Sequence, residues 1–450
     1  ASTNPCVTAE TWVMTAEGPR QVADLVGRRF MALVDGKAYP TESDGFFVTG
    51  HKPVLRLRTA EGHVLRLTAD HPVRKVTRMT RYACESEWIP AGQLSEGDKI
   101  VLHNHRAALG WEGAGTEAEG YLLGLLLGDG TLKHDKAILS VWAPEVKVVV
   151  GDARHQARAL APSAEGILRA AEAAASTLPH RADFRGFQSP VDGRGEFRLA
   201  SAALRDLAFS MGLQPGRKGV TPQMEQGSSA FCAGLLRGWF DADGSVQGSQ
   251  DKGVSVRLTQ VDLDNLEAAQ RMLARLGIVS TLYRERRSPG LRLLPDGRGG
   301  RREYPTQALH ELIISGDNLA LFAERVGFED TAKSDRLYEA LSSYRRRLNR
   351  ERFTATVESV TEDGEAAVYD VTVAEVHAFD ANGLMVHNCA EQPLPPYGCC
   401  CLGSIDLTRF VREPFEPGAR FDEAAFAELC RVAVRMLDNV LDVTYWPLPQ

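Results

Sequence analysis

The sequence predicts a multidomain fold, in which an all-β module is formed by both ends of the chain and an α+β domain is inserted between its halves. Three observations predict it. Short β-prone runs separated by turn residues fill the N-terminal part, and such runs return near the C-terminal end. The stretch between them is richer in helix formers and arginine and contains an internal repeat. We expect boundaries at 1–5, 6–115, 116–350, 351–388 and 389–450.

Length and composition narrow the class of protein. A chain of 450 residues allows about two to four domains. The formal net charge of -7 argues against bulk affinity for nucleic acid but leaves local basic patches possible. No apolar run reaches the roughly 18 to 20 residues that span a bilayer, and no signal peptide opens the chain. Eight cysteines, three of them consecutive, do not form a secreted disulfide framework. We expect a cytoplasmic protein with reduced thiols and no membrane partner.

The N-terminal β-prone part begins at Cys6 and contains a strand that ends in Thr68-Ala69-Asp70-His71. A hydroxyl and an imidazole three residues apart at a strand end can converge on one carbonyl group. The alternative is a strand-ending turn in which Thr68 and Asp70 bond the backbone. The expected strands lie at 30–34, 45–49, 54–59 and 63–68.

The C-terminal β-prone part ends in Val386-His387-Asn388-Cys389. An Asn directly before a thiol residue can attack its own carbonyl through the side-chain amide, which closes a succinimide and cuts the backbone. His387 is placed to move the protons that this cyclisation requires. Cys389 supplies a nucleophile that can hold an acyl group meanwhile. A simple turn is the alternative for this tripeptide taken alone.

The middle part contains two similar apolar segments, 122–130 and 236–244, and each ends in Asp-Gly. Their glycines would let two helices approach closely, which would bring Asp129 and Asp243 side by side at one end. Two adjacent carboxylates repel each other unless a cation lies between them, and a hard divalent ion fits. The pair therefore predicts a metal-assisted site for phosphodiester hydrolysis. Two buried helices with polar caps are the alternative.

Seven arginines between Tyr283 and Tyr304 form a basic stretch that fits a DNA-facing hairpin. A solvated loop is the alternative. A second basic cluster at 345–347 and Arg350 lies near the return to the β-prone part. The seven candidate DNA-contact residues are Arg284, Arg286, Arg287, Arg292, Arg298, Arg301 and Arg302.

The segment 421–440 has the periodicity of an amphipathic helix, with Asp422 as its expected N-cap. The apolar face is expected to consist of Phe426, Leu429, Cys430, Ala433, Leu437 and Val440.

The motifs at the two ends together resemble the splicing blocks of an intein, a family with an all-β Hint horseshoe fold. Asp370 and His377 fall where that family places its penultimate catalytic Asp and His. The resemblance implies autocatalytic excision of 6–388 and ligation of Pro5 to Cys389, without any cofactor. It implies as catalytic residues Cys6, Thr68, His71, Asp370, His377, His387, Asn388 and Cys389.

Two alternatives to splicing are also compatible with the sequence. The first is a Hint-type autoprocessing module that cleaves without ligating. The second is a fragment of the protein to which the flanking residues belong, with an inert insertion. Intact Asn388 and Cys389 favour splicing, whereas Pro5 has a fixed φ angle that limits how its carbonyl can be presented.

The sequence that ligation would create resembles the active-site loop of an adenosylcobalamin-dependent (class II) ribonucleotide reductase. Its Asn-Pro-Cys-x-Glu implies Asn4, Cys389 and Glu391 as functional residues. The redox cysteine of that family would be Cys400, although its neighbours Cys399 and Cys401 leave the choice open. The cobalamin site is not in this chain, so we expect it not to reduce nucleotides, and a ribonucleotide would bind only to the complete spliced host.

The two Asp-Gly segments resemble the paired motifs of LAGLIDADG homing endonucleases, which are commonly nested in inteins. The resemblance implies pseudo-two-fold symmetry, Mg²⁺ held by Asp129 and Asp243, and a double-stranded DNA target in the uninterrupted reductase gene. Lys218 matches the family's catalytic lysine, and Lys333 is its counterpart in the second repeat. Either lysine would stabilise charge on phosphate, with an ordinary surface role as the alternative.

Overall fold

The computed structural model describes residues 6–80, 83–108, 110–142, 145–149, 156–160, 162–180, 182–189, 195–249, 253–295, 300–342, 349–388 and 403–444. The chain divides into two compact units, residues 1–390 and residues 391–450.

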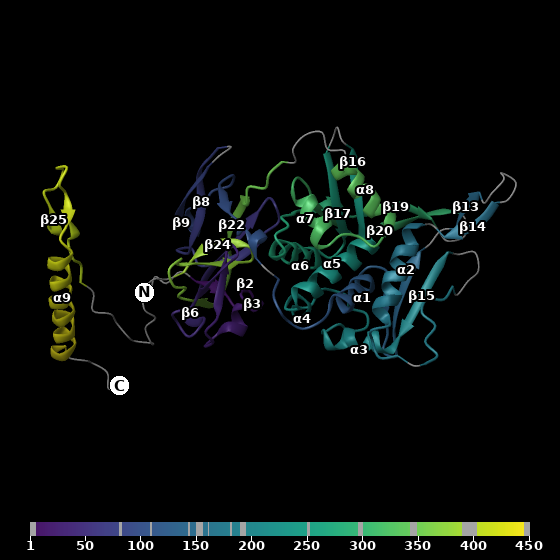
Figure 1. Ribbon diagram of the computed structural model, residues 1–450, viewed down its shortest axis with the longest axis horizontal. Coiled ribbons are helices and arrows are strands. Elements are labelled where there is room, and N and C mark those ends of the chain that lie inside the picture. Colours follow the sequence, from purple (N-terminus) through teal and green to yellow (C-terminus); the bar gives the residue numbers. More distant parts are fainter. Residues whose placement is uncertain are drawn as a thin grey trace. The chain divides into compact units, whose positions relative to one another are not determined.

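The first unit contains a nine-stranded sheet that draws on both ends of the chain. Its strands run in the order β1-β7-β6-β22-β10-β8-β24-β23, and β9 pairs with β8. In Figure 1, β22 and β24 accordingly lie among the purple and blue strands of the N-terminal part. The strands are β1 (Val7–Thr8), β6 (Phe47–Thr59), β7 (Val64–Leu67), β8 (Pro72–Met79), β9 (Cys84–Pro90), β10 (Lys99–Val101), β22 (Thr354–Asp370), β23 (Ala378–Ala381) and β24 (Leu384–His387).

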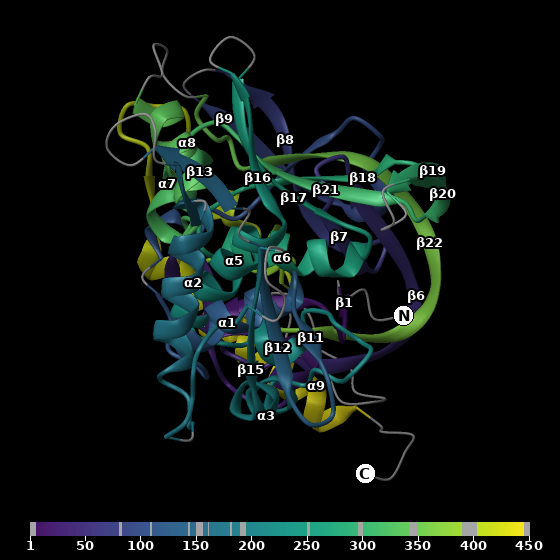
Figure 2. The same cartoon turned by 90° about the vertical axis from the view of Figure 1, so that its right-hand side faces the viewer.

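The longest pairing in this sheet joins β6 to β22, two curved ribbons that run antiparallel side by side (Figure 2). β1 pairs with both β7 and β22, through Val7 opposite Leu67 and Tyr369. The residue that precedes β1 is thereby brought to the ends of strands from both halves of the module. The predicted assembly of a β-rich part from both ends of the chain is confirmed.

A smaller sheet with the order β3-β2-β4-β5 accompanies the first one. Its strands are β2 (Trp12–Thr15), β3 (Gly18–Gln21), β4 (Met31–Val34) and β5 (Lys37–Pro40). Short 3-10 helices connect strands in this part of the chain, namely η1 (Val22–Leu25), η2 (Ala91–Gln93) and η3 (His105–Ala107).

The middle of the chain mixes helices with four separate sheets, in the strand orders β11-β12-β15, β13-β14, β16-β17-β21-β18 and β19-β20. The helices are α1 (Glu117–Leu127), α2 (Pro162–Ala175), α3 (Ala202–Ser210), α4 (Pro222–Glu225), α5 (Ser229–Asp243), α6 (Leu263–Arg275), α7 (Asn318–Arg325) and α8 (Thr331–Ser342). The strands are β11 (Thr131–Leu132), β12 (Ala137–Trp142), β13 (Glu145–Val149), β14 (Gln156–Leu160), β15 (Glu196–Ser201), β16 (Gly244–Ser249), β17 (Gly253–Gln260), β18 (Thr281–Arg287), β19 (Gly290–Pro295), β20 (Arg301–Thr306) and β21 (Leu309–Ile314).

The β module and the middle part each have a large hydrophobic core of their own. The core of the β module lies between the nine-stranded sheet and the β3-β2-β4-β5 sheet and includes Phe46, Leu65 and Phe379. The other packs α1 and α5 against the middle sheets and includes Leu122 and Trp239. Separate cores are the mark of separately packed domains. Trp111, which the predicted boundary assigned to the β module, belongs to the middle core and donates from Nε1 to the Gly227 carbonyl over 2.8 Å.

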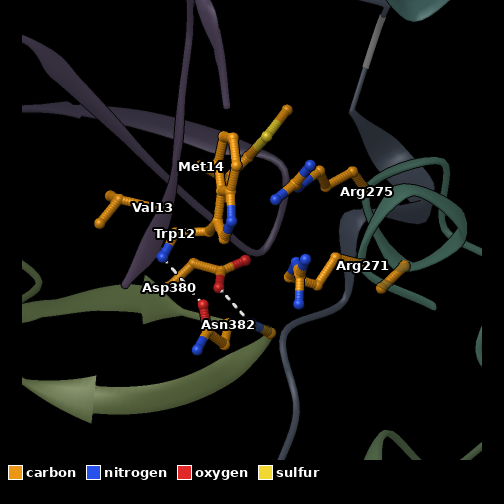
Figure 3. Close-up of a pocket in the computed structure, with 9 residues that line it drawn as sticks. Trp12, Val13, Met14, Arg271, Arg275, Asp380 and Asn382 are labelled. Carbon is orange, nitrogen blue, oxygen red and sulfur yellow. Dashed lines mark hydrogen bonds between the residues drawn. The ribbon is translucent and has the colours of Figure 1, made fainter. Parts of the chain in front are cut away.

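The two cores meet where α6 faces β2 and the β23–β24 turn. In Figure 3, Arg275 of α6 points towards Trp12, and Arg271 points towards Asp380 and Asn382. The guanidinium of Arg275 lies 4.8 Å from the centroid of the Trp12 ring. The Trp12 amide donates to Asn382 Oδ1 over 2.8 Å, and the Asn382 amide donates back to the Trp12 carbonyl over 2.9 Å. The side chain of Asn382 also reaches the Val64 carbonyl at 2.9 Å. The middle domain therefore packs against the turn that precedes the C-terminal junction.

The second unit is described by itself. It contains η4 (Leu407–Phe410), the short pair β25 (Val411–Arg412) and β26 (Arg420–Phe421), and α9 (Glu423–Val443). The predicted helix and its N-cap are confirmed, since Asp422 accepts a hydrogen bond from the Ala425 amide. The helix begins two residues later than predicted and ends three residues later. In the part of the chain that the structure describes, no helix combines the length and apolar character needed to cross a bilayer.

Candidate functional site

The N-terminal junction lies where β1 enters the nine-stranded sheet. Cys6 is fully buried, and its amide donates to Thr68 Oγ1 over 3.1 Å. The Thr68 amide donates back to the Cys6 carbonyl over 3.0 Å. The strand-end residue that the sequence singled out is thereby in direct contact with the predicted nucleophile.

His71 follows in the turn after β7, where its amide donates to the Thr68 carbonyl over 3.1 Å. Its ring is buried, and burial lowers the pKa of His71 to about 4. The nearby backbones of Cys6 and His387 partly offset that effect, while the charge of His387 adds to it. His71 is therefore neutral at physiological pH and lies near both junctions, which suits a proton-transfer group.

The thiol of Cys6 is surrounded by groups with opposing effects on its pKa. Burial raises the pKa of the Cys6 thiol to about 11. The Thr49 hydroxyl and the Lys52 ammonium lower it, whereas the carboxylate of Asp370 raises it. The structure thus brings the predicted Asp370 close to Cys6 from the far end of the sequence, because β22 pairs with both β1 and β6.

The C-terminal junction lies at the end of the β23–β24 hairpin, where Ala378 pairs with His387. The Asn388 amide donates to the His377 carbonyl over 3.1 Å, and the rings of His377 and His387 stack 6.3 Å apart. The His387 ring packs edge-on against Trp88. Nδ1 of His387 contacts the carbonyl oxygen of Asn388, and that oxygen belongs to the bond expected to break. Asn388 itself is fully buried.

Five of the predicted site residues lie outside the residues that the structure describes, so their roles remain predictions from the sequence. These are Asn4, Cys389, Glu391, Cys400 and Arg298. The alternatives Cys399 and Cys401 and the basic cluster at 345–347 also lie outside them.

A second site forms where α1 packs against α5. A Cβ atom added to Gly124 would stand 2.1 Å from the Leu235 carbonyl oxygen, and one added to Gly238 would stand 2.2 Å from that of Tyr121. Gly120 and Gly234 make equivalent approaches to the opposite helix. Since no other residue fits such distances, the glycines bring the two helix backbones into contact.

This helix contact brings together the two predicted acids, Asp243 as the last residue of α5 and Asp129 two residues after the end of α1. Burial raises the pKa of Asp129, and it also raises that of Asp243, with the negative charge of Asp129 as the next contribution. Asp243 accepts hydrogen bonds from Trp239 Nε1 and Gln260 Nε2. A raised pKa at two neighbouring carboxylates is the electrostatic condition that a divalent cation relieves.

The two predicted lysines lie at the ends of these helices. Lys218 Nζ donates to the carbonyls of Gly128 and Gly130, over 3.0 and 2.7 Å. Lys333 Nζ donates to the carbonyls of Phe240 and Asp241, over 3.1 and 2.5 Å. Burial lowers the pKa of both lysines, opposed by nearby carboxylates that include Asp129 and Asp243. Each lysine is therefore anchored beside the acidic pair.

The basic stretch folds as β18 and the β19–β20 hairpin, but its arginines do not all face solvent. Arg284 is held inside the unit by Glu267 at 3.5 Å, Glu358 at 3.3 Å and the Gly62 carbonyl at 3.2 Å. Arg286 lies 3.5 Å from Glu311. Arg292 is half-buried, and the exposed members are Arg286, Arg287, Arg301 and Arg302.

Sequence reasoning missed three residues at these sites, namely Thr49, Lys52 and Asp241. Asp241 is buried, which raises its pKa to about 6, and it accepts hydrogen bonds from Tyr121 Oη and the amide of Asp330. The doubled acid in Asp241-Ala242-Asp243 was the signal for it. Thr49 and Lys52 belong to no motif, so nothing in the sequence indicated them.

The chain is similar to a known family and to several known proteins. Residues 230–327 match the model of a family described as a LAGLIDADG-like domain. The chain is 26% identical over 408 residues to the ribonucleoside-diphosphate reductase NrdEB subunit alpha of Bacillus subtilis (strain 168), a match that covers 86% of this chain and 36% of that protein. Over 62 residues it is 44% identical to the vitamin B12-dependent ribonucleoside-diphosphate reductase of Mycobacterium tuberculosis (strain CDC 1551 / Oshkosh), covering 14% of this chain and 8% of that protein.

Among solved structures, the chain is similar to the G-1F mutant of the Ssp DnaB mini-intein variant M86. The match covers 86% of the present chain and 99% of the mini-intein chain, with 10% sequence identity and a TM-score of 0.26. The chain spans about a third of the length of the Bacillus reductase subunit. The chain therefore combines the motifs of an intein with a LAGLIDADG-like domain, and it is similar to ribonucleoside-diphosphate reductases.

Proposed function

We propose that residues 6–388 excise themselves and join Pro5 to Cys389, and that residues 116–350 form a homing endonuclease. The observation that carries the splicing proposal is the position of His71, which lies near the backbones of both Cys6 and His387. A neutral imidazole there can move a proton at the Cys6 nitrogen, and the His387 backbone that it also lies near directly precedes Asn388.

In the first step, the Cys6 sulfur attacks the carbonyl carbon of Pro5. A C–S bond forms, the peptide C–N bond breaks, and the thiol proton ends on the nitrogen of Cys6. Thr68 supports this step because its hydroxyl fixes the orientation of that nitrogen at 3.1 Å. His71, neutral and close to the Cys6 backbone, delivers the proton to the leaving nitrogen.

In the second step, the thiol of Cys389 attacks the thioester, and the sulfur of Cys6 leaves with the proton. Asp370 supports this exchange, because its carboxylate lies close enough to the Cys6 thiol to influence its pKa. A thiol with a raised pKa is a poor leaving group as an anion, so its departure requires a proton.

In the third step, the side-chain nitrogen of Asn388 attacks its own carbonyl carbon, and the bond to Cys389 breaks. The departing nitrogen gains the proton that the carboxamide loses. His387 supports this step because its Nδ1 contacts that carbonyl oxygen. The backbone carbonyl of His377 accepts a hydrogen bond from the backbone N–H of Asn388 over 3.1 Å and so positions that residue. The free amine of Cys389 then takes the acyl group from its own sulfur, which restores a peptide bond.

Mass spectrometry of the expressed chain tests the splicing proposal. Splicing yields residues 6–388 as one product and residues 1–5 joined to 389–450 as the other. An Asn388→Ala chain should form the N-terminal thioester but release no ligated product. Cleavage without ligation in the unmodified chain would favour an autoprocessing module, and an uncut chain would favour an inert insertion.

The nuclease proposal is carried by the meeting of Asp129 and Asp243 at the ends of α1 and α5, whose mutual glycine contacts fit a pseudo-two-fold arrangement. These two carboxylates would hold Mg²⁺, which when bound supplies Lewis-acid activation of a water and of the phosphodiester. In the described residues no group of three or more acids, cysteines or histidines gathers to hold a metal. Two protein carboxylates leave most positions on Mg²⁺ to water and phosphate, as that ion prefers.

Lys218 and Lys333, anchored beside the acids, would stabilise negative charge on the phosphate. Cleavage of double-stranded DNA carrying the uninterrupted reductase site, with Mg²⁺ present, tests the proposal. Asp243→Asn should abolish cleavage while splicing continues. Equal cleavage by the parent and the Asp243→Asn variant would refute the assigned acids.

We propose that the ligated product restores an adenosylcobalamin-dependent reductase loop, with Asn4, Cys389 and Glu391 brought together by splicing. Support comes from the identity of 44% to the M. tuberculosis vitamin B12-dependent enzyme over 62 residues. The spliced full-length host should reduce ribonucleotides with adenosylcobalamin, and the Asn388→Ala precursor should not.

A further inference from the structure

The thiol of Cys6 lies against two polar side chains from β6. Thr49 Oγ1 is 2.8 Å from Cys6 Sγ, and Lys52 Nζ is 3.6 Å from it. We propose that Lys52 is a catalytic residue of the first splicing step and that Thr49 assists it, both acting by stabilising the Cys6 thiolate. This inference rests on the proposed splicing function and names two residues that belong to none of the motifs behind it.

A β-bulge places both side chains on the thiol. Residues three apart in a regular strand point to opposite faces, so Thr49 and Lys52 would not normally converge. The pairing of β6 with β22 shifts between Val368–Gly50 and Tyr369–Val48, which leaves Thr49 without a partner in the register. Gly50 adopts a φ of 132° there, a backbone conformation that glycine tolerates. The bulge therefore reorients the strand at the point where it passes Cys6.

The Cys6 thiol needs nearby groups that stabilise its thiolate, because burial works against its ionisation. With a pKa near 11, about one Cys6 thiol in ten thousand is ionised at pH 7, and the thiolate is the nucleophile. Asp370 opposes ionisation, and the neutral His71 contributes no charge. Lys52 is the cation that lowers the pKa of the Cys6 thiol, and Thr49 lowers it by hydrogen bonding.

Thr49 is oriented for this role. Its hydroxyl lies 3.2 Å from the Val368 carbonyl, to which it donates when the thiol is protonated. When the thiol ionises, the hydroxyl proton can turn to the sulfur instead. The ammonium of Lys52 stays charged throughout the step: the thiol proton moves to the Cys6 nitrogen, a C–S bond forms and the C–N bond breaks, without any co-reactant.

The test isolates the first step in an Asn388→Ala/Cys389→Ala chain, which can neither transfer the acyl group nor cyclise. Dithiothreitol then cleaves the thioester, and mass spectrometry follows the release of residues 1–5. Lys52→Met and Lys52→Gln should each slow release about tenfold at pH 7.5, which corresponds to a rise of about one unit in the pKa of Cys6. Lys52→Arg, which keeps the charge, should recover most of the rate. Thr49→Val should slow release several-fold, and Thr49→Ser should not.

A lysine in the same sheet provides the matched control. Lys75 on β8 forms an ion pair with Asp98 at 2.8 Å, away from the thiol, so Lys75→Met should release residues 1–5 at the parent rate. Melting temperatures of all variants separate a catalytic role from a structural one. A Lys52→Met chain that reacts like Lys75→Met overturns the inference. The inference is also overturned if Lys52→Met slows the release of residues 1–5 but lowers the melting temperature as well, and Lys52→Arg does not restore the rate.

The same experiment distinguishes this failure from failure of splicing itself. If the parent double variant releases nothing with dithiothreitol, or releases as much after Cys6→Ala, the splicing proposal fails. If the parent releases residues 1–5 in a Cys6-dependent manner, splicing chemistry stands, and only the behaviour of Lys52 and Thr49 is then at issue.

Discussion

Cys6 and Thr68 are joined by two reciprocal hydrogen bonds. The Cys6 amide donates to the Thr68 hydroxyl over 3.1 Å, and the Thr68 amide donates to the Cys6 carbonyl over 3.0 Å. The first bond involves the nitrogen that would leave in the proposed first step, while the second belongs to the β-type backbone pairing beside it. Only the first depends on the side chain of Thr68.

The first prediction concerns this side chain. Thr68→Val keeps the shape of the side chain but removes the hydroxyl that accepts a hydrogen bond from the buried Cys6 amide. We expect it to slow thioester formation at least about tenfold and to lower the free energy of unfolding by about 1–2 kcal/mol, since a buried N–H loses its partner. Thr68→Ser should restore most of both. Dithiothreitol-induced cleavage and urea unfolding measure the two effects, and a Thr68→Val chain with parental cleavage would contradict the assigned role.

The second prediction concerns pH. Burial lowers the pKa of His71 and of His63 to about 4, below the value of 6.5 in an unfolded chain. Between these values the unfolded state binds more protons, so each histidine makes the folded state less stable as pH falls from 6.5 towards 4. For each one we expect a loss of about 2 kcal/mol between pH 7 and pH 5.

Urea unfolding of the unreactive Cys6→Ala/Asn388→Ala chain at both pH values measures this loss. His71→Gln should reduce the pH-dependent difference by about 2 kcal/mol, because glutamine does not titrate. His134→Gln, at an exposed position, is the control. An unchanged difference after His71→Gln would show that His71 is not held neutral by burial.

The third prediction concerns the contact between α1 and α5. Gly124→Ala would place a methyl group 2.1 Å from the Leu235 carbonyl oxygen, so the helices must separate. We expect a loss of about 3 kcal/mol in unfolding free energy, seen as a lower melting temperature, and loss of DNA cleavage. Gly290→Ala, where nothing lies within 4 Å, is the matched control. Parental stability of Gly124→Ala would mean that the helices do not pack this closely.

The fourth prediction separates the arginines by their surroundings. Arg301 and Arg302 are exposed on β20, and each contact with phosphate that alanine removes should reduce the salt slope of DNA binding by about one. Arg284 is engaged by Glu267 and Glu358, so Arg284→Ala should lower the melting temperature and leave the salt slope unchanged. Fluorescence anisotropy over a salt series provides the measurement. A reduced slope for Arg284→Ala would return it to the DNA-contact set.

The reaction that we expect at each junction could be proposed from the sequence because it depends on residue types close together in the chain. Asn388 beside Cys389 and Thr68 near His71 are short patterns that each suggest one reaction, with a simple turn as the alternative. The Gly-rich helices ending in Asp129 and Asp243 were predictable for the same reason, since the spacing of the glycines already implies a close helix pair. The α9 helix and its Asp422 cap also followed from local periodicity.

The sequence by itself thus determined which side chains are candidates for reaction and the class of reaction that we expect of each. Only the tertiary structure decided which neighbours tune them. Lys52 reaches the Cys6 thiol through a bulge in the pairing of β6 with β22, and Arg284 turns inward to acids of α6 and β22. These contacts join residues that lie tens of positions apart in the chain, and a one-residue shift in register would remove them. Local patterns carry no record of register, so the environment of each reactive group appears only when the strands are paired.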